Sequence, residues 1–223
     1  MTPTSSSVDL YWLPLGAGGR FVAFNGRVYE TIAARRGKRQ PLDLYHTALV
    51  VTVPEGRFVI ENAWPIPDAD KTARGVAVDG PVGFDWLGRF RGFRYEVRCW
   101  RNGTIADVAE AMGGAYRVSD DEVVARRVLA LVPDVPPLLW GRKPPGAREM
   151  WNSNSVISWL LARGGLDIDR IHPPRGGRAP GWSTGLELAH QGPLTGQSWT
   201  SGAKRRRGQP GHRSSGPDPE RRG

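Results

Sequence analysis

Residues 45–60 carry the clearest strand pattern in the chain. The stretch 45–53 is rich in β-branched and aromatic side chains, and the stretch 57–60 is again mostly apolar. The turn residues 54–56 (Pro-Glu-Gly) separate the two stretches. Two strand-like stretches on either side of a short turn predict a β-hairpin.

Two further stretches predict strands. Residues 91–100 alternate between apolar and polar side chains, which predicts a half-exposed strand with Cys99 on its apolar side as a small core residue. Residues 21–29 contain the turn dipeptide Asn25-Gly26 between short apolar runs, which predicts another hairpin. Strand patterns therefore dominate the first hundred residues.

Helical patterns come later in the chain. Residues 119–122 (Ser-Asp-Asp-Glu) supply an N-cap and an acidic first turn for a helix that Pro133 ends. A second helix is predicted from about residue 153 to residue 163 and is closed by the glycines at 164–165, whereas residues 104–111 form a weaker helical stretch. Early strands followed by later helices predict an α+β fold.

The composition changes near residue 190. From there the chain is mainly Gly, Pro, Ser, Arg and Gln, so we predict one domain over residues 1–190 and a disordered basic tail over residues 191–223. The tail holds seven Lys and Arg against two acidic residues, which is +5 of the net charge of +9. The remaining +4 is ordinary for a domain of this size. Only the tail, through Lys204–Arg207, is a candidate for binding nucleic acid or an acidic surface, and a solvated tail without a fixed role is the simpler interpretation.

The sequence disfavours several classes of protein. No apolar run approaches the roughly 20 residues that span a bilayer, and residues 1–9 lack the features of a secretory signal, so a cytoplasmic protein is expected. A single cysteine excludes an internal disulfide and a Cys-based metal site, and no His, Asp and Glu residues have metal-ligand spacing, so we expect neither a metal nor another cofactor. The glycine-rich residues 15–20 precede a predicted strand rather than a helix, which disfavours a nucleotide site.

The segment 151–155 (Trp-Asn-Ser-Asn-Ser) is the strongest candidate for a site. Four of its residues are polar, and the apolar run 156–161 follows. One or two of them are explained as caps, because Asn and Ser side chains accept hydrogen bonds from the free N–H groups of a first helical turn. The same N–H groups and the positive end of the helix dipole favour a nucleophile and an oxyanion. His46, at the start of a strand, is the candidate base, although a lone histidine is more often structural.

These pieces together resemble the circularly permuted branch of the papain-like (NlpC/P60-related) superfamily. In that branch the histidine strand comes first, a strand with a polar residue follows, and the nucleophile opens a later helix. Residues 45–51 are similar to the histidine strand, residues 59–62 to the second strand, and residues 151–155 to the Asn-Cys-Asn motif, with Ser153 at the cysteine position. More closely, residues 11–189 resemble an uncharacterised bacterial group with LGAGG, DLYH, FVIE, WNSNS and GGRAPGW elements.

The resemblance implies an antiparallel sheet packed against the nucleophile helix, and a hydrolase or acyltransferase that acts on an amide, ester or thioester of a small molecule, peptide or lipid. The implied nucleophile is Ser153, and the implied base is His46, which Glu61 or Asn62 orients. The implied substrate-binding residues are Trp151, Asn152 and Asn154. A serine hydroxyl has a far higher pKa than a thiol and depends more on its base. The alternative is therefore a catalytically inactive binding protein of the same fold, whose basic tail serves an acidic partner.

The residue that orients the base stays open between Glu61 and Asn62. If residues 54–56 form a three-residue turn, Ala48 pairs with Asn62, which places Asn62 on the same face as His46 and Glu61 on the other face. Strand parity then favours Asn62 unless a bulge shifts the register, whereas the resemblance favours Glu61.

Overall fold

The computed structural model describes residues 5–15, 40, 42–65, 74–105 and 107–191. These residues form an α+β domain in which an antiparallel sheet carries helices. Three predictions lie outside the described residues: the hairpin at 21–29, most of the glycine-rich segment 15–20, and the disordered tail beyond residue 191.

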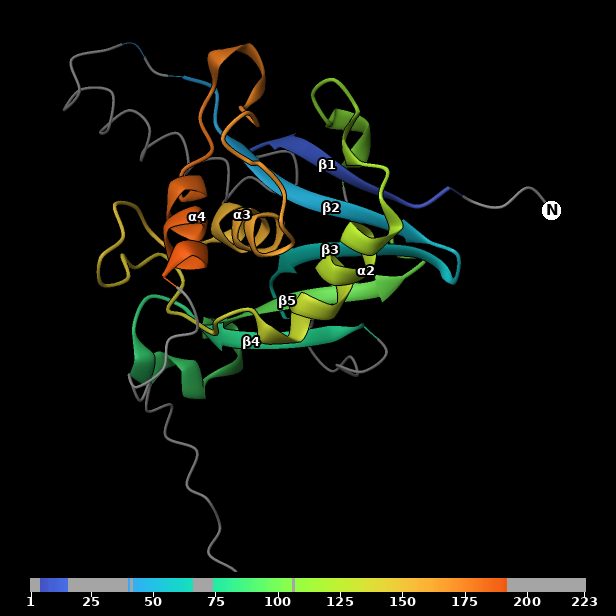
Figure 1. Ribbon diagram of the computed structural model, residues 1–223. Coiled ribbons are helices and arrows are strands. Elements are labelled where there is room, and N and C mark those ends of the chain that lie inside the picture. The colour runs from blue at the N-terminus through green and yellow to red at the C-terminus, as the bar shows by residue number, and fades with distance from the viewer. Residues whose placement is uncertain (1–4, 16–39, 41, 66–73, 106, 192–223) are drawn as a thin grey trace, which may run out of the picture.

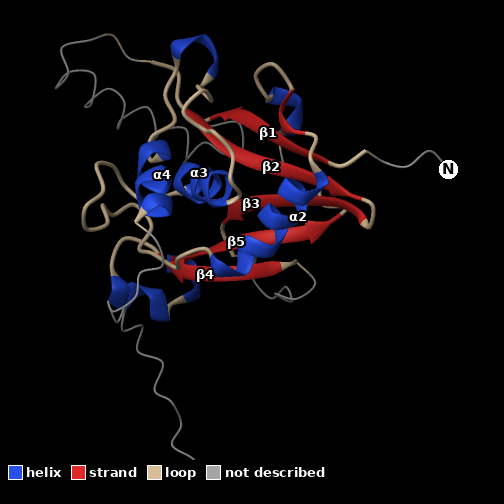
Figure 2. Ribbon diagram, viewed as in Figure 1, coloured by secondary structure: helices blue, strands red, loops and turns tan. Residues whose placement is uncertain are grey.

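Six strands form one antiparallel sheet in the order β4-β5-β3-β2-β1-β6. The strands are β1 (Ser7–Pro14), β2 (Tyr45–Val53), β3 (Gly56–Ala63), β4 (Val76–Pro81), β5 (Arg94–Arg101) and β6 (Ala115–Ser119). The helices are α2 (Glu122–Leu131), α3 (Ser153–Arg163) and α4 (Trp182–His190). These helices of the described residues lie over the same face of the sheet (Figures 1 and 2).

The stronger local patterns are confirmed. β2 and β3 form the predicted hairpin, and α3 covers the predicted range with Asn152 as its N-cap and Gly164 as its C-cap. Helix α2 begins after Asp121, whose side chain accepts a hydrogen bond from the N–H of Val123 at 2.7 Å. Short polar side chains at these positions satisfy N–H groups that have no partner inside the helix.

Two weaker predictions are corrected. The strand predicted over 91–100 begins only at Arg94, because Arg91–Phe93 forms a 3₁₀ turn. The helix predicted over 104–111 is wrong, since its described residues contain only a single 3₁₀ turn, Val108–Glu110.

The β2–β3 turn contains two residues instead of three, because Val53 pairs with Gly56. Gly56 has a φ of +145°, a conformation that glycine adopts without strain, so it serves as the first residue of the strand. The predicted pairing of Ala48 with Asn62 is therefore wrong. A shift of one residue exchanges the faces, so each residue of β3 lies on the face opposite to the predicted one.

The sheet separates two apolar clusters. The larger cluster fills the space between the sheet and the helices and includes Leu49, Val51, Ile60, Val97, Val156 and Leu160. The smaller cluster consists of Leu13, Ala48, Val50, Val59 and Ile105. Because side chains alternate along a strand, the two clusters define two faces: the helix face and the opposite face.

Cys99 packs, half-buried, against the larger cluster, as its predicted apolar position requires. Burial raises the pKa of its thiol to about 11. The thiol is therefore protonated at neutral pH, which disfavours Cys99 as a nucleophile.

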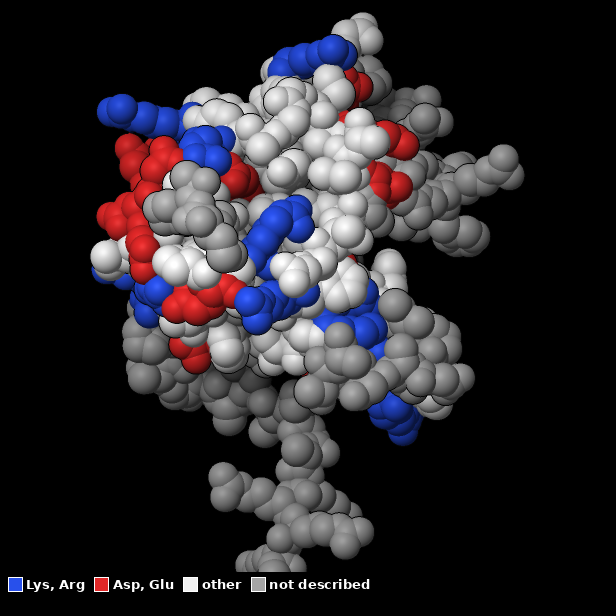
Figure 3. Space-filling view, turned by 90° about the vertical axis from the view of Figure 1, so that its right-hand side faces the viewer, with Lys and Arg blue, Asp and Glu red and all other residues white. Residues whose placement is uncertain are grey.

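The surface near the β2–β3 turn carries charges of both signs. Arg126 of α2 forms ion pairs with Glu55 of the turn at 2.8 Å and with Glu122 at 2.7 Å. Figure 3 shows acidic and basic side chains next to each other on this side of the molecule. Within the described ranges, no helix combines the length and the apolar character needed to cross a membrane.

Candidate active site at the start of α3

Helix α3 begins with a complete capping box. The Oδ1 atom of Asn152 accepts hydrogen bonds from the N–H groups of Asn154 (3.0 Å) and Ser155 (3.3 Å). In return, the Oγ atom of Ser155 accepts a hydrogen bond from the N–H of Asn152 at 3.2 Å. The cap therefore occupies the N–H groups of Asn154 and Ser155, which the predicted oxyanion hole would use.

Asn154 joins helix α3 to strand β2. Its buried Nδ2 donates to the carbonyl oxygens of Tyr45 (2.9 Å) and Pro180 (3.0 Å), and its Oδ1 accepts a hydrogen bond from Thr47 Oγ1 (3.0 Å). The ladder between β2 and β3 ends at Leu49. Asn154 thus supplies hydrogen bonds to the part of β2 that β3 does not reach.

The turn before α4 uses other polar side chains of the same segment. Ser155 Oγ donates to the carbonyl oxygen of Gly181 at 2.8 Å, and Asn152 Nδ2 donates to that of Pro180 at 2.8 Å. This turn therefore explains most of the polar residues at the helix start, although its residues lie 26 and 28 positions further along the chain than the side chains that bind them.

The three predicted substrate-binding residues make contacts inside the protein. Trp151 is 0% exposed, and its Nε1 donates to Tyr95 Oη at 3.3 Å. Asn152 caps the helix, and Asn154 ties it to β2. In this structure these side chains form hydrogen bonds within the protein and hold the start of α3 in place.

Replacement of Gly181 by alanine tests this frame. Gly181 has a φ of +87°, and an added Cβ would lie 2.5 Å from Asn152 Oδ1 and 2.7 Å from Ser155 Oγ. Gly181→Ala is expected to lower the free energy of unfolding by about 2–4 kcal/mol in urea titration, since backbone strain adds to the loss of the cap. The matched control is Gly141→Ala, which has a φ of +77° and nothing within 4 Å of an added Cβ. Equal losses in both variants would show that the contact with the cap contributes nothing.

Ser153 differs from the other residues of the segment 151–155. It is 7% exposed, and neither its Oγ nor its N–H forms a hydrogen bond with another described residue. It occupies the first helical position, where the positive end of the helix dipole favours negative charge. A hydroxyl and a free N–H on one residue offer both a nucleophile and an oxyanion donor.

His46 is the second residue of β2, between the two residues that contact Asn154, but its side chain lies on the opposite face of the sheet. It pairs with Leu13, a member of the smaller cluster, and it alternates with Thr47, which contacts Asn154. Burial lowers the pKa of His46 below its ordinary value of 6.5, and Asp107 acts in the opposite direction. No hydrogen bond joins the imidazole to Ser153 or to any other described residue.

Glu61 and Asn62 lie on different faces, in the reverse of the predicted assignment. Glu61 shares the opposite face with His46, whereas Asn62 alternates with it and lies on the helix face, where it pairs with Val97. Burial raises the pKa of Glu61, and Arg98, 3.8 Å away, lowers it. The structure therefore divides the four catalytic candidates into two pairs: Ser153 with Asn62 on the helix face, and His46 with Glu61 on the opposite face.

The side chain of Asn62 is unusual among the described residues. Its Nδ2 and Oδ1 atoms are both buried, and neither has a hydrogen-bond partner. An unpaired buried amide is costly, and it commonly marks the place of an ordered water molecule or a ligand group.

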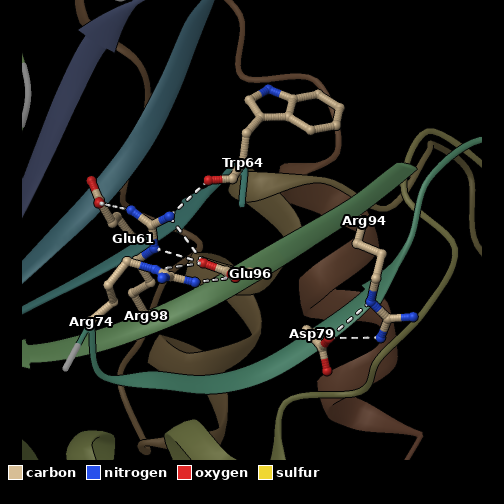
Figure 4. A network of polar contacts seen from close by, with 7 residues as sticks. All are labelled: Glu61, Trp64, Arg74, Asp79, Arg94, Glu96 and Arg98. Atoms are coloured by element: carbon tan, nitrogen blue, oxygen red, sulfur yellow. Dashed lines mark hydrogen bonds and ion pairs between the residues drawn. The ribbon is translucent and has the colours of Figure 1, made fainter. Parts of the chain in front are cut away.

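A buried network of charges adjoins Glu61 on the opposite face (Figure 4). The carboxylate of Glu96 accepts hydrogen bonds from Arg74 (2.8 Å) and Arg98 (3.0 Å), and Arg98 also donates to the carbonyl oxygen of Trp64 (2.7 Å). The sequence pattern assigned Glu96 and Arg98 to the exposed side of a strand. That assignment is wrong, because both side chains are buried where charge pairing offsets desolvation.

No protein-family model matches the chain, and comparisons with the curated proteins and with the solved structures also gave no match. Among the described residues, no group of three or more His, Cys, Asp and Glu side chains is arranged to hold a metal ion. The case for a function therefore depends on the geometry of the site and on the resemblance of its motifs.

Proposed function

We propose that the chain is a hydrolase or acyltransferase with a permuted papain-like fold, in which Ser153 takes the place of the usual cysteine nucleophile. One observation carries the proposal: Asn154 binds Tyr45 and Thr47, the residues on either side of His46. The start of the nucleophile helix thus meets the histidine strand at the histidine. The resemblance to the permuted branch requires this contact between the nucleophile helix and the histidine strand.

The proposed chemistry uses the hydroxyl and the N–H of Ser153 and the imidazole of His46. In the proposed reaction Ser153 Oγ attacks the carbonyl carbon of an amide, ester or thioester, His46 accepts the hydroxyl proton, and the N–H of Ser153 donates to the oxyanion. Because His46 lies on the opposite face of the sheet, this step requires its imidazole to reach Ser153 around the edge of β2 that β3 leaves unpaired. His46 then gives the proton to the leaving group, and water or another acceptor removes the acyl group from Ser153. The lowered pKa of His46 keeps its imidazole neutral at pH 7, as a base requires. Glu61, on the face of His46, is the better placed residue to orient it.

The test is labelling by a fluorescent fluorophosphonate, a probe that reacts with activated serines. We expect labelling of the wild-type protein at neutral pH, none in Ser153→Ala, and a rate at least about 100-fold lower in His46→Ala, the usual minimum for loss of a general base. The matched control is Ser183→Ala, because Ser183 is a nearby serine whose hydroxyl already binds Glu149 at 3.2 Å. Labelling that persists in Ser153→Ala would contradict the proposal.

A binding protein of the same fold is the second candidate, and specific contacts favour it. Asn152 occupies two N–H groups at the helix start, His46 makes no hydrogen bond to Ser153, and the amide of Asn62 is buried without a partner. In this case the site holds a ligand with matched donor and acceptor groups, and the basic tail serves an acidic partner. Complete absence of fluorophosphonate labelling in the wild-type protein supports this candidate over the enzyme.

A further inference from the structure

Five large aromatic side chains are exposed, four of them within residues 84–93, and none of them belongs to the proposed active site. We call them the aromatic surface: Trp64, Phe84, Trp86, Phe90 and Phe93, each between 45% and 59% exposed. Half-exposed rings of this size present together roughly 500 Å² to solvent. Exposed apolar surface of this extent is often functional.

The aromatic surface extends from the edge of the sheet. Most of it belongs to residues 84–93, which form two 3₁₀ turns between the edge strand β4 and strand β5, at the lower left of Figure 1. The backbone holds these turns in place, because the N–H of Val82 binds the carbonyl oxygen of Phe93 (2.9 Å) and the N–H of Gly83 binds that of Trp140 (3.1 Å). The backbone that carries these rings is therefore held in place by hydrogen bonds.

Two arginines accompany the rings. The guanidinium of Arg89 lies 5.6 Å from the ring centre of Trp86 and 5.3 Å from that of Phe90, and the guanidinium of Arg142 lies 4.5 Å from that of Phe84. Neither arginine forms an ion pair with a described carboxylate. Two positive charges beside exposed aromatic rings suit a partner that is both anionic and apolar.

We propose that the aromatic surface docks the protein on a membrane that contains anionic lipids. Trp and Phe side chains favour the boundary between lipid headgroups and acyl chains, while arginine binds lipid phosphates. A single-stranded nucleic acid fits less well, because Arg89 already covers the rings of Trp86 and Phe90 on which bases would stack. This docking surface is independent of the chemistry at Ser153.

The test is sedimentation of the full chain with vesicles. We expect binding to vesicles of phosphatidylcholine and phosphatidylserine, and weaker binding to vesicles of phosphatidylcholine alone. The double variant Trp86→Ala/Phe90→Ala should bind the anionic vesicles at least about tenfold more weakly, and Arg89→Gln/Arg142→Gln should also lose about tenfold. The control variant is Val123→Ser, because Val123 is 62% exposed on α2, away from the aromatic surface.

A contribution to vesicle binding from the positive charges of residues 191–223 would be the same in the wild type and in Trp86→Ala/Phe90→Ala, so the difference between them reports the aromatic surface. Equal binding by these two proteins would overturn the proposal. So would a loss of binding to a single-stranded oligonucleotide in the same variant with vesicle binding unchanged, which would assign the surface to nucleic acid.

Discussion

Replacement of Asn154 by alanine is expected to lower the free energy of unfolding by about 3–5 kcal/mol. The Asn154 side chain is buried and makes hydrogen bonds to Tyr45 and Thr47 of β2 and to Pro180 before α4, so its removal leaves three buried polar groups in two segments without that partner. It also leaves a cavity beside β2. Urea titration monitored by tryptophan fluorescence measures the loss.

A graded variant keeps this prediction testable if Asn154→Ala fails to fold. Thr47→Val retains the shape of the side chain and removes only the hydrogen bond to Asn154 Oδ1, so we expect a loss of about 1–2 kcal/mol. Losses below about 1 kcal/mol in both variants would show that Asn154 does not join α3 to β2 in solution.

Replacement of Glu96 by glutamine should destabilise the domain by a similar amount, about 3–5 kcal/mol. Glu96 is 1% exposed and binds Arg74 and Arg98, so the substitution removes the negative charge that these two buried guanidinium groups share. The control is Glu55→Gln, which removes a carboxylate from the exposed pair with Arg126 and should change stability little. Similar effects of the two substitutions would contradict a buried network.

The same network predicts how stability depends on pH. Burial by itself raises the pKa of Glu96, but the hydrogen bonds from Arg74 and Arg98 outweigh it, and the net pKa is lowered. A carboxyl group whose pKa is lower in the folded state stabilises that state above its unfolded pKa, and this contribution is lost as the pH falls through the folded pKa. The wild type should therefore lose stability on acidification more steeply than Glu96→Gln.

Local signals in the sequence predicted the hairpin β2–β3 and the helices α2 and α3. Each has strong short-range information, such as a turn between β-branched runs or the caps Asp121 and Asn152. The register of the hairpin was not predictable from the turn residues alone, because Gly56 belongs to the strand and not to the turn. A single residue decided which face carries Glu61.

Features that depend on contacts between distant segments of the chain were not predicted from the sequence. Strands β1, β4 and β6 and helix α4 were not predicted, and the polar strand residues Glu96 and Arg98 were expected in solvent. Their burial depends on Arg74 and the carbonyl oxygen of Trp64, which reach them from other parts of the chain. Charge pairing across such distances leaves no periodic pattern in the sequence.

The start of α3, where the candidate site lies, was predictable from the sequence. The division of the four catalytic candidates between the two faces of the sheet was not. Polar residues before an apolar helical run indicated the start of α3, and the structure leaves only Ser153 of that segment without a side-chain partner among the described residues. The roles of Asn152, Asn154 and Ser155 depend on Pro180 and Gly181, which no local pattern connects to them.

Peptide mapping of the protein after reaction with a fluorophosphonate tests the central claim most directly. The account predicts one adduct, on Ser153, whose rate of formation falls at least about 100-fold in His46→Ala. An adduct on a different serine, or an adduct on Ser153 that forms equally fast without His46, would contradict it.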